Sequence, residues 1–318
     1  MKRICFFSSI FLTAILLSGC DYFSAGNIQN VGMLTEGSID DEGWVDKGYQ
    51  GLLNIGDTYE VDVFYEENVR TEQQTREAVD EFVRDGVNLI FGHSSSYGPY
   101  FSELADDYPD VHFVYFNGGY MDENVTSLNF NSHAVGFFAG MVAGRMTEAD
   151  KVGIIAAYEW QPEIEGFFEG VHYENPQAEI EIDFLNNWQD DGRAAEIYHT
   201  MKENGTDVFY PTGDSFSRSI IEQAEEDGLY AIGYIVDQSD IDERTVLTST
   251  RQHVDQLYET VAEEFDNGSL NGSIITYDLE DEVISLGEFS PDVPQDFQEK
   301  LNEELEKYKQ TGLLPNER

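Results

Sequence analysis

Short apolar runs that alternate with longer amphipathic segments constrain the fold of this chain more than any other feature. Several runs are continuous in their apolar residues, which is typical of parallel strands covered on both faces. The pattern predicts an α/β protein with parallel sheets. Ten runs rich in β-branched and aromatic residues stand at 31–34, 61–65, 89–92, 113–116, 127–130, 152–156, 180–185, 208–211, 230–235 and 246–249.

The segments between these runs have the spacing of amphipathic helices, as at 71–84 and 194–203. Gly86, Gly205 and Gly228 each stand shortly before an apolar run. Glycine at that place allows the left-handed turn that ends a helix. Strand, helix, glycine and strand in this order are typical of right-handed βαβ units.

The runs form two series that separate near Phe130, and 318 residues are enough for two domains. We therefore expect two doubly wound, flavodoxin-like lobes. The expected organisation is a signal peptide at 1–19, a lipid-anchored tether at 20–30, lobe 1 at 31–130 plus about 248–272, lobe 2 at 131–247 plus about 273–290, and a C-terminal helical tail at 291–318.

The first twenty residues have the features of a bacterial lipoprotein signal. Lys2 and Arg3 precede an apolar stretch at 4–17, which is shorter than the roughly 20 residues of a membrane-spanning helix. Residues 17–20 resemble a lipobox, so we expect cleavage before Cys20 and lipidation of its thiol. Two acyl chains suffice for stable anchoring on the extracellular face of the cell membrane. The alternative is that Cys20 is an ordinary buried cysteine.

The strongly negative net charge of the chain excludes nucleic acid as a partner. The chain has 63 acidic and 17 basic residues and a formal net charge of −46. Nucleic-acid binding depends on clustered Lys and Arg, so no nucleic-acid partner is expected. Aromatic residues make up 13% of the chain, which favours a folded protein over a disordered one. We interpret the excess acid as a solvated surface suited to a saline or alkaline exterior.

Enzyme motifs are absent or incomplete. The segment 92–96 resembles the nucleophile elbow of serine hydrolases but has serine in place of the final glycine. The six histidines lack zinc-site spacing, and no dinucleotide or P-loop motif occurs. We therefore expect no enzymatic activity, no cofactor and no metal site. An envelope hydrolase using Ser94, or the pair Asp40 and Asp41, is the remaining enzymatic alternative.

Ligands of open α/β sheets bind beyond the carboxyl ends of the strands. All three tryptophans of the chain fall there, and each alone could equally be a core or hinge residue. Aromatic rings together with carboxamides and carboxylates suit a planar, hydrogen-bonding small molecule. The sequence thus predicts a ligand cleft between the lobes. The candidate residues after the strands are Asp40, Trp44, His93, Asn117, Trp160, Trp188, Asp214 and Asp237.

Several short segments, taken in order, resemble a known family over nearly the whole mature chain. The chain is similar to the basic membrane protein (BMP, PnrA-like) family of substrate-binding lipoproteins, which includes purine nucleoside receptors of ABC transporters. That resemblance implies a type I periplasmic-binding-protein architecture. The segments are 39–41 with Gly51, 108–113, 124–127, 137–140, 151–153, 167–170, 205–208, 230–233, 237–238 and 247–249.

The resemblance also implies roles for single residues. In nucleoside-binding members two aromatic rings sandwich the base, and Trp44 and Trp188 stand at the matching positions. An acid that reads the base edge is matched by Asn117, which offers a donor as well as an acceptor. Two ribose contacts, an acid and a lysine, are matched by Ile235 and Gln252. We therefore expect a different base or edge preference.

Taken together, these features predict a lipid-anchored extracellular solute-binding protein. It would capture a small planar, nucleoside-like ligand between its lobes for an ABC importer, with the permease as partner. The alternative is a ligand sensor on the same fold, a competence-type regulatory lipoprotein without transport. Its acidic surface would dock a basic patch of a membrane partner. In the solute-binding protein, Trp44 and Trp188 would stack on the ligand, and Asn117, His93, Asp214 and Asp237 would hydrogen-bond it.

Overall fold

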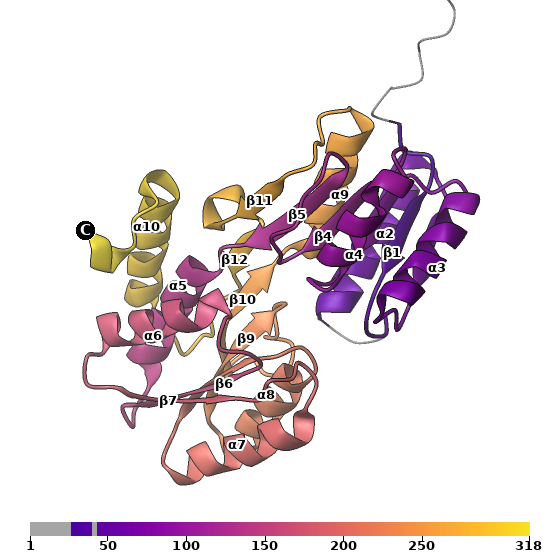
Figure 1. The fold of residues 1–318 in the computed structure, drawn as a ribbon. Helices are drawn as coiled ribbons and strands as arrows, with labels where there is room; N and C mark the ends of the chain where they lie inside the picture. Colours follow the sequence, from indigo (N-terminus) through magenta and orange to yellow (C-terminus); the bar gives the residue numbers. More distant parts are fainter. Residues whose placement is uncertain (1–26, 40–42) are drawn as a thin grey trace, which may run out of the picture.

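The computed structural model describes residues 27–39 and 43–318 and arranges them as two α/β lobes (Figure 1). The expected signal peptide, Cys20 and most of the expected tether lie outside the described residues, as does Asp40. Each lobe is built on a six-stranded sheet.

Lobe 1 is built on the sheet β11-β5-β4-β3-β1-β2, in which every pair is parallel. Helices α2 and α9 pack on one face with Val31 and Phe91, and α3 and α4 pack on the other with Leu34 and Ile90. The strands are β1 (Val31–Leu34), β2 (Val63–Glu66), β3 (Leu89–Gly92), β4 (His112–Phe116), β5 (Val125–Phe130) and β11 (Ile274–Tyr277), and the helices are α2 (Trp44–Tyr59), α3 (Glu72–Arg84), α4 (Tyr97–Leu104), η1 (Ala105–Asp107) and α9 (Val254–Asp266).

Lobe 2 is built on the sheet β12-β10-β9-β8-β6-β7, in which only the pair β10 and β12 is antiparallel. Helices α7 and α8 cover one face, and α5 and α6 cover the other. The strands are β6 (Lys151–Ala156), β7 (Glu179–Phe184), β8 (Val208–Thr212), β9 (Tyr230–Ile235), β10 (Val246–Gln252) and β12 (Ile284–Leu286), and the helices are α5 (His133–Met146), α6 (Pro162–Glu174), α7 (Asp191–Glu203), α8 (Phe216–Asp227), η2 (Leu279–Asp281), α10 (Gln295–Thr311) and η3 (Pro315–Glu317).

The expected α/β class and the two parallel-sheet lobes are confirmed. All ten expected strands overlap an observed one. Gly86, Gly205 and Gly228 have φ angles of 82°, 94° and 68°, which is the left-handed conformation expected of them. The strands β11 and β12 were not expected. Both are short edge strands with partly exposed residues, so their own sequence carries little apolar signal.

The strand pairing places the boundaries between the lobes later in the chain than expected. We expected lobe 1 to resume near residue 248, but β10 remains in the second sheet to Gln252 because it pairs with β9 and β12. We expected lobe 2 to resume near residue 273, but β11 pairs with β5 of lobe 1. The C-terminal segment forms α10 and packs on lobe 2, where the Tyr308 hydroxyl donates to Asp278 and Lys300 pairs with Glu174.

Helices α5 and α6 pack backbone against backbone because glycines line their contact. A Cβ atom at Gly136 or Gly140 of α5, or at Gly166 or Gly170 of α6, would lie 1.9 to 2.2 Å from a carbonyl oxygen of the other helix. No larger side chain fits without separating the helices. This close approach holds the first turn of α6 in place at the junction of the lobes.

Gly140→Ala tests this packing. The added methyl group meets the Phe167 carbonyl oxygen at 2.2 Å. Overpacking costs about 1–3 kcal/mol or more, and here it outweighs the gain of up to about 1 kcal/mol from alanine in a helix. We expect the free energy of unfolding to fall by about 2 kcal/mol in urea titrations. Gly119→Ala is the control, since nothing lies within 4 Å of its Cβ position. Equal midpoints for Gly140→Ala and wild type would contradict the prediction.

Candidate functional site: a cleft between the lobes

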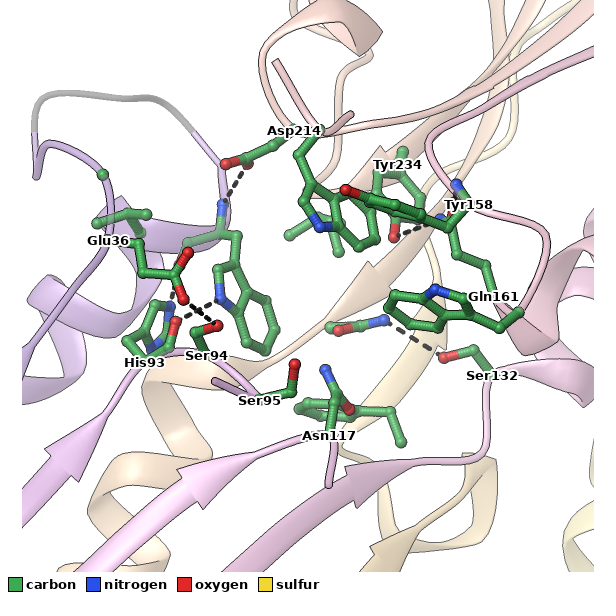
Figure 2. Close-up of a pocket in the computed structure, with 18 of the residues that line it drawn as sticks. Glu36, His93, Ser94, Ser95, Asn117, Ser132, Tyr158, Gln161, Asp214 and Tyr234 are labelled. Atoms are coloured by element: carbon green, nitrogen blue, oxygen red, sulfur yellow. Dashed lines mark hydrogen bonds between the residues drawn. The ribbon is translucent and has the colours of Figure 1, made fainter. Parts of the chain in front are cut away.

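A cleft of about 630 Å³ lies between the carboxyl ends of the two sheets. Figure 2 shows Glu36, Ser94, Ser95 and Asn117 on one side and Tyr158, Gln161 and Tyr234 on the other. The expected gap between the lobes is therefore present. From lobe 1 it is lined by Thr35, Glu36, Trp44, Arg70, His93, Ser94, Ser95, Asn117 and Phe130, among others, and from lobe 2 by Tyr158, Trp160, Gln161, Glu163, Trp188, Asp214, Tyr234, Ile235 and Gln252.

Aromatic rings from both lobes line the cleft, and all three tryptophans are among them. Trp44 belongs to lobe 1, at the start of α2. Trp188, Trp160 and Tyr158 form a cluster on lobe 2, with ring centroids 5.2 to 5.7 Å apart. The Trp160 side chain is 57% exposed. Rings on facing lobes provide the arrangement that can hold a flat molecule between them.

The His93 ring packs against the Trp44 ring and helps to fix its position. The two rings stack with centroids 4.6 Å apart, and the indole Nε1 donates to the His93 carbonyl oxygen at 3.3 Å. His93 Nε2 lies 2.8 Å from the Trp44 carbonyl oxygen, so Nε2 carries the proton. Nδ1 then accepts from the Tyr258 hydroxyl at 2.9 Å. Both nitrogens are used within lobe 1, so the expectation that His93 hydrogen-bonds a ligand is replaced by a positioning role for Trp44.

Burial lowers the pKa of His93 to about 4, although the hydrogen bond to Trp44 raises it. An exposed histidine has a pKa of 6.5, so the unfolded chain takes up the proton first as the pH falls. Stability from this group is thus present above pH 6.5 and is lost as the pH falls toward 4. The loss is on the order of 3 kcal/mol.

We expect His93→Gln to remove this part of the pH dependence. The measurement is the free energy of unfolding in urea at pH 7 and pH 4.5, for wild type and variant. His199→Gln, at an exposed position of α7, is the control. If wild type and His93→Gln lose the same free energy between the two pH values, the buried neutral histidine is not the cause.

Asn117 follows β4 in a left-handed conformation, with a φ of 56°. Asparagine tolerates this conformation better than most residues. Its backbone N–H donates to Leu128 at 2.9 Å, and its side chain lines the cleft. Gln252 lines the cleft from the end of β10 and donates to the Ser132 hydroxyl at 3.3 Å. Both expected residues therefore lie in the cleft.

Asp214 joins the two lobes. Its Oδ1 accepts from the backbone N–H of Trp44 at 3.2 Å, across the cleft. This places a carboxylate of lobe 2 at the N-terminus of α2, where the helix dipole favours negative charge. Asp214 lines the cleft as expected, and it also forms a hydrogen bond between the two lobes.

Asp237 does not line the cleft. Its carboxylate accepts from the backbone N–H groups of Ser239 and Glu288, each at 3.1 Å. Burial raises its pKa, but hydrogen bonds from these two residues outweigh burial, and the pKa is lowered. Asp237 therefore links the turn after β9 to the segment after β12. It was expected in the ligand site, but its carboxylate contacts the protein outside the cleft. A residue just after a strand can turn its side chain back toward the protein.

The nucleophile-elbow segment does not form a serine–histidine pair. The Ser94 hydroxyl donates to Glu36 at 2.8 Å, while His93 uses both nitrogens on Trp44 and Tyr258. The residues Asp40 and Asp41 lie outside the described segments. Within residues 27–39 and 43–318, no group of three His, Cys, Asp or Glu residues could hold a metal ion.

Sequence reasoning missed Glu163, Tyr234, Glu36 and Arg70 as cleft residues. Glu163 is 3% exposed at the start of α6, and one acid among 63 has no distinguishing signal. Tyr234 lies inside the expected strand 230–235, and the apolar run around it does not indicate that it lines a cleft.

The architecture, two facing lobes with an aromatic cleft, defines a class of binding protein, and comparison with known proteins identifies it. Residues 28–318 match the Bmp family, described as ABC transporter substrate-binding protein PnrA-like. The chain belongs to this family, which confirms the resemblance noted in the sequence. Its two lobes have the architecture of type I periplasmic binding proteins, as in a solute-binding protein of an ABC transporter system from Conexibacter woesei (TM-score 0.74, 21% identity, 91% of this chain and 99% of that one).

Two nearer relatives share most of their sequence length with this chain. The transcriptional activator protein Med of Bacillus subtilis is 47% identical over 96% of this chain and 97% of its own. The crystal structure of a transcriptional activator of the comK gene from Bacillus halodurans has a TM-score of 0.84 at 45% identity, covering 90% of this chain and 99% of that one. A third relative has lower identity: a purine-binding protein of Brucella abortus is 25% identical over 89% of this chain and 81% of its own.

Proposed function

We propose that this protein is a lipid-anchored extracellular receptor that closes its lobes around a small planar, nucleoside-like ligand. The observation that carries the proposal is the cleft with Trp44 on one lobe and Trp160 and Trp188 on the other. Stacking on an aromatic ring contributes about 1–3 kcal/mol per base in other proteins. Polar side chains beside the rings, including Asn117 and Gln252, supply donors and acceptors for the ligand edge.

The comparisons support a nucleoside-like ligand. The matching family is one of substrate-binding proteins, and the relative from Brucella abortus is named as purine-binding. The acids Glu36, Glu163 and Asp214 line the cleft with one base, Arg70. That balance favours a neutral or cationic ligand over a phosphorylated one. The family description supports delivery of the ligand to an ABC permease.

A regulatory function is the second candidate, because the relative with 47% identity is named a transcriptional activator. In this version a ligand-bound closed form engages a membrane partner and no transport follows. The net charge of −46 argues against direct contact with DNA. Uptake of radiolabelled adenosine by cells with and without the gene separates the two: reduced uptake in the deletion supports transport, and unchanged uptake supports sensing.

Trp44→Ala tests the stacking proposal. Loss of one stacking ring is expected to weaken binding at least tenfold in calorimetry with adenosine, guanosine and inosine. Circular dichroism verifies that the variant is folded. Phe168→Ala is the control, since that ring is 41% exposed on α6 and does not line the cleft. Unchanged affinity in Trp44→Ala would remove the stacking proposal.

Cys20→Ser tests the lipid anchor. Among the described helices, none is long and apolar enough to cross a membrane. If the thiol of Cys20 carries the lipid, the variant is released from the membrane fraction and no longer incorporates labelled palmitate. Cys5→Ser, in the expected signal peptide, should leave mature protein anchored and labelled. Full membrane retention of Cys20→Ser would contradict lipid anchoring at this residue.

A further inference from the structure

A buried carboxyl group lies at the lobe 2 side of the cleft. Glu163 is 3% exposed and yet lines the cleft, in the first turn of α6. Its backbone carbonyl lies against Gly136 of α5, where a Cβ atom would come within 2.2 Å of it. The glycine contact between the two helices therefore leaves Glu163 little freedom to move away from the cleft.

The neighbours of Glu163 are donors with fixed orientation. Gln161 Nε2 donates to Glu163 Oε1 at 2.9 Å, and also reaches the Thr212 carbonyl and the Tyr234 hydroxyl at 3.1 Å each. Gln161 Oε1 accepts from the Tyr158 N–H at 2.8 Å, which sets the orientation of the amide. The Tyr234 hydroxyl lies at the far end of this set of contacts, and Figure 2 shows Gln161 and Tyr234 side by side.

These donors do not use the full capacity of the carboxyl group. A carboxylate has about four lone-pair sites, and the hydrogen bond from Gln161 to Oε1 uses one of them. In the described part of the chain no Lys or Arg forms an ion pair with Glu163. Arg70 belongs to the other lobe, and its Nε donates to the Glu36 carbonyl. Burial raises the pKa of Glu163, although hydrogen bonding acts in the opposite direction.

We propose that Glu163 is the specificity-determining acceptor of the cleft, selecting flat ligands that present an N–H donor, neutral or cationic, over ligands that present an acceptor or an anion. The proposal rests on the proposed function and adds the chemical class of the ligand. A donor from the ligand takes one of the remaining lone pairs. An acceptor at the same place leaves two lone pairs facing each other without a proton, which costs binding free energy.

The test uses pairs of probes that differ by one amino group. Calorimetry measures adenosine against purine riboside, and guanosine against inosine, with wild type and Glu163→Met. Methionine has a similar length and removes both acceptors. We expect wild type to bind the amino member of at least one pair at least tenfold more tightly, and Glu163→Met to reduce that ratio below threefold. Benzamidine against benzamide extends the comparison to a cationic N–H donor.

Controls separate specificity from folding. Glu165→Met changes an exposed acid of the same helix turn and should keep the wild-type ratio. If Glu163→Met does not fold, Glu163→Gln replaces it, because the amide keeps the size and one acceptor while losing the charge. It is expected to reduce the ratio at least threefold. A purely structural role would weaken both members of a pair equally and leave the ratio unchanged.

The outcomes distinguish this inference from the proposed function. Purine binding with no preference for the amino member, or with a preference that survives both Glu163 substitutions, overturns the inference and leaves the receptor proposal standing. If no purine binds, the proposal of a nucleoside-like ligand is wrong. The inference about Glu163 is then tested by the binding of benzamidine against benzamide and of 2-aminopyridine against pyridine at millimolar concentration. If wild type prefers the N–H donor of each pair and the Glu163 substitutions remove that preference, the inference is supported. If wild type shows no preference, the inference is overturned.

Discussion

The whole arrangement depends on the way parallel strands end. Both sheets are parallel apart from one edge pair, so in each lobe the carboxyl ends of most strands lie at one edge. The chain passes between the lobes after β5, after β10 and after β11, which places these two edges opposite each other. Ser132 and Gln252, at two of these crossings, are hydrogen-bonded and line the cleft. The connections between the lobes are thus part of the ligand site.

Local rules of chain conformation are broken at this site. Ile235 has a φ of 66°, a left-handed conformation that is a genuine outlier for a β-branched side chain, and it lines the cleft. His93 is buried without charge to hold Trp44, and Glu163 is buried without a cation. The left-handed conformation of Ile235 and the burial of the Glu163 carboxyl group each cost free energy in the fold. Their concentration around one cleft agrees with a binding function, since strain and buried polar groups cluster at functional sites.

Much of the fold could be predicted because its signals are local. A buried parallel strand such as β3 is a continuous apolar run, and a glycine such as Gly228 ends a helix for a backbone reason that does not depend on distant residues. The edge strand β11 lacks this signal because half of its residues are exposed and, among the described strands, it pairs with β5 alone. Similarly, Asp237 follows a strand as Asp214 does, but a turn directs its carboxylate to Ser239 instead of the cleft.

The sequence by itself determined the α/β class, the positions of ten strands, the family and the concentration of tryptophans at strand ends, since periodicity and composition act over a few residues. Only the tertiary structure decided what each side chain faces. It turned the His93 nitrogens to Trp44 and Tyr258, moved β10 and β11 to the sheets that pair with them, and brought Glu163 to the cleft. Direction and burial depend on contacts between residues far apart in the chain, and no local pattern encodes them.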